Sequence, residues 1–189
     1  CETASSSASR VGLGERPSNA ADLMSSRVMI VDDEPINVKV ARKFVGTLGY
    51  SNFVTLTDSR KVIEALHEEK PDVLLLDLMM PDISGLDILE VMHSDADLKR
   101  IPVIILTASS DRGTRLRALE LGATDFLAKP LDPEELAPRI RNALLMRSYE
   151  NHLRDHAQTL EETVRHRTND LCASRLELLH CLARAAEHR

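Results

Sequence analysis

Short apolar runs alternate with amphipathic stretches from residue 27 onward, and this alternation is the dominant pattern in the chain. The runs read VMIV, FVTL, VLLL, VIIL and a weaker DFLA, at residues 28–31, 53–56, 73–76, 103–106 and 125–128. The runs are continuous rather than alternating, which is typical of strands covered on both faces. Five such strands separated by helical patterns predict an α/β fold with a doubly wound, five-stranded parallel sheet.

The stretches between these runs carry helix signals. Pro35 is well suited to the first turn of a helix, and Gly122 fits the end of one. Further helices are predicted at about 85–93 and 111–121. The last helix begins in LDPEEL, but Pro138 lies beyond its first turn and is expected to kink it or shift its start.

The last helical pattern continues as a heptad seam through the rest of the chain. Its members, which step by four and three residues, are Leu153, Ala157, Leu160, Val164, Arg167, Leu171, Ser174, Leu178, Cys181 and Ala185. This spacing predicts a long coiled-coil helix, most simply a parallel homodimer through residues 148–189. The alternative is one amphipathic helix that lies on a globular domain. Arg167 and Ser174 are polar exceptions in the seam.

Three segments follow from these patterns. Residues 1–26 are rich in serine and are expected to form a disordered leader. Residues 27–147 form the predicted α/β domain, and residues 148–189 form the predicted dimerisation helix.

The composition of the chain indicates where the protein works and which classes of partner it is expected not to bind. The chain has 189 residues, of which 43% are hydrophobic, and a net charge of −6, which argues against nucleic acid as a partner. No apolar run is long enough to cross a membrane, and no secretory signal is evident. The three cysteines have neither disulfide-framework nor metal-site spacing. We therefore expect a cytoplasmic protein that binds neither membrane nor nucleic acid.

Polar side chains follow the predicted strands at one edge of the sheet. The first strand ends on Asp32 and Asp33, the third on Asp77, the fourth on Thr107 and the fifth on Lys129. The carboxyl ends of parallel strands share one edge, where ligands bind. Singly, each residue equally fits a turn, a helix cap or an ordinary strand end.

Together, the strand-end residues predict a metal and phosphoryl site. Crowded carboxylates repel one another unless a cation neutralises them, and hard oxygen ligands in an open site suit Mg²⁺. A nearby amine and hydroxyl suit a phosphoryl group. One of the carboxylates could then act as nucleophile toward phosphorus and form an aspartyl phosphate.

Four motifs resemble the receiver domain of two-component response regulators: VDDEPIN, LLLDLMMPDISGLDIL, PVIILTA and GATDFLAKPLDPEEL. The resemblance covers about residues 27–147. It implies that Asp77 is the phosphoacceptor, supplied by a phosphohistidine on a sensor histidine kinase. It also implies that Asp33, Asp77 and the backbone carbonyl of Met79 bind Mg²⁺, with Asp32 assisting through water.

The same resemblance implies roles for the later motifs. Lys129 would contact the phosphoryl group, and Thr107 would turn toward it on activation. Phe126 would be the switch aromatic residue, and the Lys129–Pro130 peptide bond would be cis.

A second resemblance concerns the tail. VRHRTNDLCASRLELLHCLARAAEHR looks like the linker that precedes HD-GYP domains in RpfG-like cyclic di-GMP phosphodiesterases. No HD pair or GYP triplet is present, so this chain is expected not to be an enzyme beyond phosphorylation and dephosphorylation at Asp77. The alternatives are a complete dimeric receiver that acts by protein contact, or a receiver for another output, such as a diguanylate cyclase, a serine phosphatase or, least favoured, a DNA-binding domain.

Overall fold

The structure is a computed structural model that describes residues 23–108 and 111–187, with side chains described as far as Leu171 and at Arg175. Most of the predicted leader, residues 1–22, lies outside the described residues. The described chain contains a five-stranded, wholly parallel sheet with strand order β2-β1-β3-β4-β5. The strands are β1 (Arg27–Val31), β2 (Asn52–Leu56), β3 (Val73–Asp77), β4 (Val103–Thr107) and β5 (Asp125–Ala128). The predicted fold class is confirmed.

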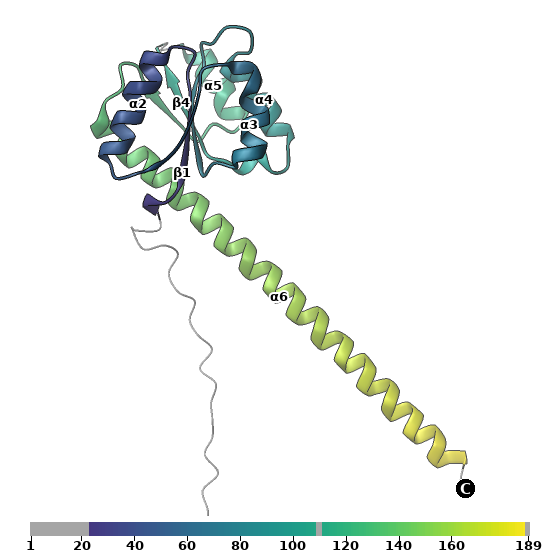
Figure 1. Cartoon of the computed structure of the whole chain (residues 1–189). Helices are drawn as coiled ribbons and strands as arrows, with labels where there is room; N and C mark the ends of the chain where they lie inside the picture. Colours follow the sequence, from purple (N-terminus) through teal and green to yellow (C-terminus); the bar gives the residue numbers. More distant parts are fainter. Residues whose placement is uncertain (1–22, 109–110, 188–189) are drawn as a thin grey trace, which may run out of the picture. The chain divides into compact units, whose positions relative to one another are not determined.

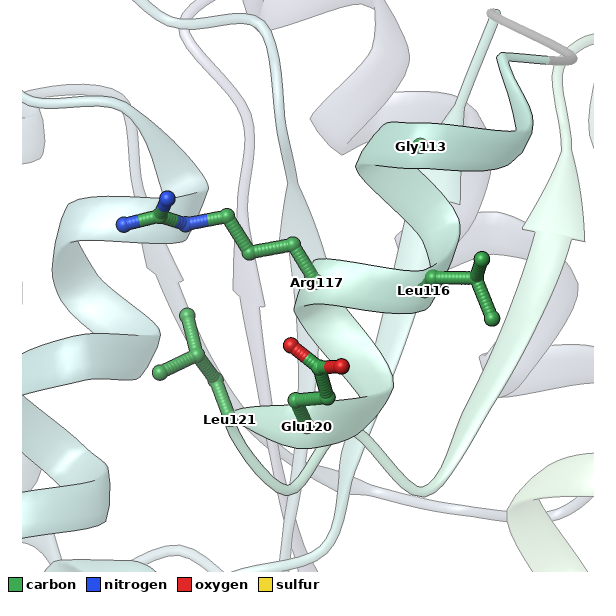
Figure 2. A pocket seen from close by; sticks show the side chains of 5 residues that line it. All are labelled: Gly113, Leu116, Arg117, Glu120 and Leu121. Carbon is green, nitrogen blue, oxygen red and sulfur yellow. The ribbon is translucent and has the colours of Figure 1, made fainter.

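Helices cover both faces of the sheet (Figure 1). They are α2 (Pro35–Thr47), α3 (Val62–Glu69), α4 (Gly85–Ser94), α5 (Arg112–Glu120) and α6 (Pro133–Glu187), with short 3₁₀ turns η1 (Ser59–Lys61) and η2 (Leu98–Arg100). One face packs against α3, α4 and α5, and the other packs against α2 and the first turns of α6. Each strand therefore contributes side chains to two cores.

The central strands show why their sequences are continuously apolar. Leu74 and Leu76 belong to the core beneath α3 and α4, whereas Leu75 belongs to the core beneath α2 and α6. All three side chains are fully buried. Burial of one such side chain contributes about 2 kcal/mol, so a polar residue at any of these positions would be costly.

Helix α6 begins at Pro133 and runs through Pro138 without an interruption. The expected shift of its start does not occur. Pro138 lies on the exposed side, while Leu136 and Ile140 on either side of it are fully buried against the sheet. Packing of these two residues holds the backbone helical although Pro138 has no N–H to donate.

The contacts divide the chain between Ser148 and Tyr149. The second unit is the remainder of α6, and the apolar seam residues that the structure describes there are highly exposed. Exposed fractions are 69% for Leu153, 66% for Leu160, 63% for Val164 and 72% for Leu171. None of the described helices has both the length and the apolar character needed to cross a bilayer.

Candidate functional site

Three carboxylates converge at the carboxyl edge of the sheet, as the strand-end pattern predicts. Val31 pairs with Leu76, so the residues that follow β1 and those that end β3 reach the same level of the sheet. One carboxylate oxygen each from Asp32, Asp33 and Asp77 lies within 4.8 Å of the others. This cluster is the only group of three or more potential metal ligands among the described residues.

Lys129 bridges two of these carboxylates. Its Nζ lies 2.7 Å from Oδ2 of Asp77 and 2.7 Å from Oδ2 of Asp32. The backbone N–H of Lys129 donates to the carbonyl oxygen of Thr107 at 2.9 Å, which ties the end of β5 to the end of β4. The Lys129–Pro130 peptide bond is cis, as expected.

Burial makes the electrostatics of the cluster unusual. Asp32 is fully buried and Asp77 is 4% exposed. Burial raises the pKa of Asp77, because desolvation disfavours the charged carboxylate more than Lys129 favours it. Burial also opposes the charge on Lys129, but its two carboxylate partners together raise the Lys129 pKa above its ordinary value. Keeping Asp77 and Lys129 charged in this buried cluster therefore costs solvation free energy.

The donor set fits a hard divalent cation. Oδ1 of Asp32 accepts hydrogen bonds from the Glu34 backbone N–H and the Asn37 side-chain amide, both at 3.0 Å. Oδ2 of Asp32 is buried and accepts no well-directed hydrogen bond from the described residues, although it lies in ion contact with Lys129. Three carboxylates and one ammonium leave a formal charge of −2. Oxygen ligands and this charge match Mg²⁺.

The remaining predicted residues lie on β4, on β5 and in the loop after β3. Thr107 is 6% exposed at the end of β4, and the Met79 backbone N–H donates to Oδ1 of Asp77 at 3.3 Å. Phe126 is 7% exposed, and the guanidinium carbon of Arg115 lies 5.0 Å from its ring centroid. The roles predicted for these residues, and Met79 as a carbonyl ligand, remain predictions.

Three residues that support the site had no predicted role. Asn37 orients Asp32 through the hydrogen bond described above. The buried hydroxyl of Ser59 donates to the Pro81 carbonyl at 2.8 Å and accepts from the Ile83 N–H at 3.3 Å, which holds the loop after β3. Gly85 lies against the backbone of Asp77 and Leu78, where a Cβ would have no room. The only sequence signals were that Asn37 and Gly85 fall inside the distinctive motifs.

Residues 28–141 match the response regulator receiver domain family. The chain belongs to this family. Receiver domains accept phosphate from histidine kinases, and the chain contains the receiver domain of a two-component response regulator. The match ends within α6, so the helix beyond residue 141 lies outside it.

Similar curated proteins are response regulators of several kinds. A ycf27 transcriptional regulator of Guillardia theta is 38% identical over 70% of this chain and 50% of its own length. The response regulator PleD of Caulobacter vibrioides is 36% identical, over 63% of this chain and 26% of its own. The DNA-binding response regulator MtrA of Mycolicibacterium smegmatis is 34% identical, over 65% and 52%. The chain thus spans a quarter to about half of these relatives.

Solved structures agree with the fold and the metal chemistry. The receiver domain of a signal transduction histidine kinase from Syntrophus aciditrophicus is 30% identical, with a TM-score of 0.58 over 64% of this chain and 90% of that one. The receiver domain of the sensor histidine kinase PA1611 from Pseudomonas aeruginosa is 26% identical, with a TM-score of 0.58 over 64% and 98%. A magnesium ion is coordinated in the active-site cleft of that protein.

Proposed function

We propose that Asp77 accepts a phosphoryl group from a phosphohistidine of a sensor histidine kinase. The observation that carries this proposal is the buried contact of Lys129 with both Asp77 and Asp32, beside the third carboxylate of Asp33. In the transfer, a carboxylate oxygen of Asp77 forms a bond to phosphorus as the bond from phosphorus to the donor nitrogen breaks. The electron pair of that bond returns to the imidazole of the donor, so no other reactant is needed.

The surrounding side chains each support this transfer. Asp32, Asp33, Asp77 and the carbonyl of Met79 would hold Mg²⁺. When bound, this cation neutralises the carboxylates and the oxygens of the incoming phosphoryl group. Lys129 contacts Asp77 and would pair with a phosphoryl oxygen.

Two further residues would respond to phosphorylation. Thr107, at the adjacent strand end, would donate its hydroxyl to the phosphoryl group. Phe126 would report the change on the face formed by α5, β5 and the start of α6.

Phosphorylation by a small-molecule donor such as acetyl phosphate tests this assignment. The wild-type chain should gain one base-labile phosphoryl group by intact-protein mass spectrometry when Mg²⁺ is present, and Asp77→Asn should gain none. Asp33→Ala should lose both Mg²⁺ binding and phosphorylation. Asp58→Asn is the matched control, because Asp58 also follows a strand but pairs with Arg60 outside the cluster. Wild-type labelling of Asp77→Asn would refute the assignment.

We further propose that residues 148–189 form a parallel, two-stranded coiled coil that makes the chain a homodimer. The heptad seam and the exposure of Leu153, Leu160, Val164 and Leu171 support this proposal, because a solvated stripe of large apolar residues is costly unless a partner covers it. The side chains of the seam beyond Leu171, Cys181 among them, lie outside the described residues.

The output proposed for the whole protein is an HD-GYP cyclic di-GMP phosphodiesterase. It rests on the resemblance of the tail sequence to RpfG-like linkers. The relatives point to a second candidate, since MtrA is named as a DNA-binding response regulator. The length and sequence of the protein's gene beyond the codon for Arg189 separate these outputs: metal-binding HD and GYP motifs support the first, and a winged or helix-turn-helix domain contradicts it.

A further inference from the structure

Two histidines form a close pair on the second unit of the chain. His152 and His156 are one helical turn apart on α6, and their ring centroids lie 4.3 Å apart in an edge-to-face arrangement. His156 is exposed and His152 is half-buried, so both rings are accessible to a solvated ion. Two histidines at i and i+4 project from the same face of a helix, which is the spacing that lets imidazoles share one Zn²⁺.

The charges near this pair favour a cation. Asp155 lies three residues after His152, on the adjoining part of the helix surface. Arg154 lies two residues from each histidine and therefore points away from their shared face. Imidazole nitrogens suit Zn²⁺, Cu²⁺ and Ni²⁺ better than Mg²⁺, so this chemistry differs from that of the strand-end carboxylates.

In the proposed parallel dimer, the heptad register would bring a third possible ligand to this pair. With Ala157 at position a and Leu160 at position d, His156 occupies position g and Glu161 occupies the next position e. In a parallel two-stranded coil, residue g of one helix faces residue e of the following heptad of the other. In the proposed parallel dimer, His156 would therefore face Glu161 of the partner subunit. In the same register, Asp170 would face Arg175 of the partner subunit, and these opposite charges would favour the parallel arrangement.

We propose that His152 and His156 bind Zn²⁺ on the dimeric tail, with Glu161 of the partner subunit as the third protein ligand. Two nitrogens, one carboxylate oxygen and a water complete the tetrahedral coordination that Zn²⁺ prefers. The proposal rests on the parallel dimer proposed above. Each dimer would carry two such sites, and Zn²⁺ would tighten the dimer because every site contains ligands from both subunits.

Zn²⁺ titration by calorimetry tests the site in the full chain. A cysteine-free background and saturating Mg²⁺ remove the thiols and the strand-end carboxylates as competing ligands. One Zn²⁺ per chain is expected. His152→Gln and His156→Gln should each weaken binding by at least the roughly ten- to hundredfold that loss of a group supporting a ligand costs. His166→Gln is the matched control, because His166 lies on the same helix but pairs with Asp170 at 2.8 Å.

Sedimentation without metal separates failure of the site from failure of the dimer. A dimer in which Glu161→Gln weakens Zn²⁺ binding, while the control variant does not, supports the shared site. Unchanged Zn²⁺ affinity in both His152→Gln and His156→Gln overturns the site. A dimer that binds Zn²⁺ equally well with Glu161→Gln overturns the contribution of the partner subunit. A chain that is monomeric both without and with Zn²⁺ overturns the dimer itself.

Discussion

Gly85 offers a stringent test of the site, because it is the first residue of α4 and lies against the strand end that carries Asp77. The Gly85 N–H donates to the Leu78 carbonyl at 3.0 Å. A Cβ at position 85 would lie against the Asp77 carbonyl oxygen and 2.8 Å from the Leu78 Cα. Both neighbours are backbone atoms, so neither can rotate away. Gly85→Ala must move α4 or the end of β3.

The size of this effect can be bounded from packing. Forcing an extra methyl group into a filled space costs about 1–3 kcal/mol, and the rigid neighbours place Gly85→Ala toward the upper end. Gly46 is the matched control, because it lies in α2 without a positive φ and, apart from its chain neighbours and the backbone of its own helix, no described atom lies within 4 Å of its would-be Cβ. Gly46→Ala should stabilise the protein by up to about 1 kcal/mol, since alanine is the better helix former. Glycine-to-alanine substitution is therefore expected to lower the free energy of unfolding at position 85 and to raise it at position 46.

Urea unfolding in Mg²⁺-free buffer measures both variants. The midpoint should fall for Gly85→Ala and rise for Gly46→Ala, with unchanged slopes. Because the strain falls on the Asp77–Leu78 backbone, Gly85→Ala should also slow phosphorylation by acetyl phosphate, whereas Gly46→Ala should not. A Gly85→Ala variant as stable and as reactive as the wild type would refute the reasoning about this close approach.

Three other predictions concern charge and the tail. In Mg²⁺-free buffer, Asp77→Asn should become increasingly more stable than the wild type as pH rises above 3.8. The raised pKa of Asp77 means that the folded wild type binds more protons than the unfolded wild type, so the free energy of unfolding of the wild type falls over this pH range. Calorimetric unfolding of both proteins across pH tests this. Leu160→Glu with Leu171→Glu should give a folded monomer that still gains phosphate, as mass spectrometry and sedimentation can establish. Arg167→Leu places one buried leucine in each subunit and should tighten the dimer by about 4 kcal/mol, roughly a thousandfold, in sedimentation equilibrium; an unchanged dissociation constant contradicts the seam.

The strands and the acidic cluster could be predicted because each depends on local sequence. A strand that is buried on both faces must be apolar at every position, so VLLL at 73–76 alone predicts a buried strand. Parallel topology then places every strand end on one edge, which is enough to bring Asp32 and Asp77 together without knowledge of any loop.

The supporting contacts could not be predicted because they join segments whose spacing carries no periodic signal. Ser59 and Pro81 are 22 residues apart, and only the fold of two loops brings their atoms to 2.8 Å. Pro138 is the opposite case, where a strong local rule was overridden by burial of Leu136 and Ile140. Local propensity is a weak guide wherever packing on both sides fixes the backbone.

The shared contacts of Lys129 connect the charge of the cluster to the rest of the domain. The Lys129 ammonium contacts both Asp32 and Asp77, and the Lys129 backbone N–H donates a hydrogen bond to the Thr107 carbonyl. Under the proposed function, a phosphoryl group on Asp77 would replace one carboxylate charge with about two and compete with Asp32 for Lys129. If the Lys129 backbone moved with its side chain toward the phosphoryl group, its hydrogen bond to Thr107 would carry that movement to the ends of β4 and β5. Phe126 lies three residues before Lys129, so under the proposed function the buried ring beside Arg115 would respond to the charge on Asp77 through β5.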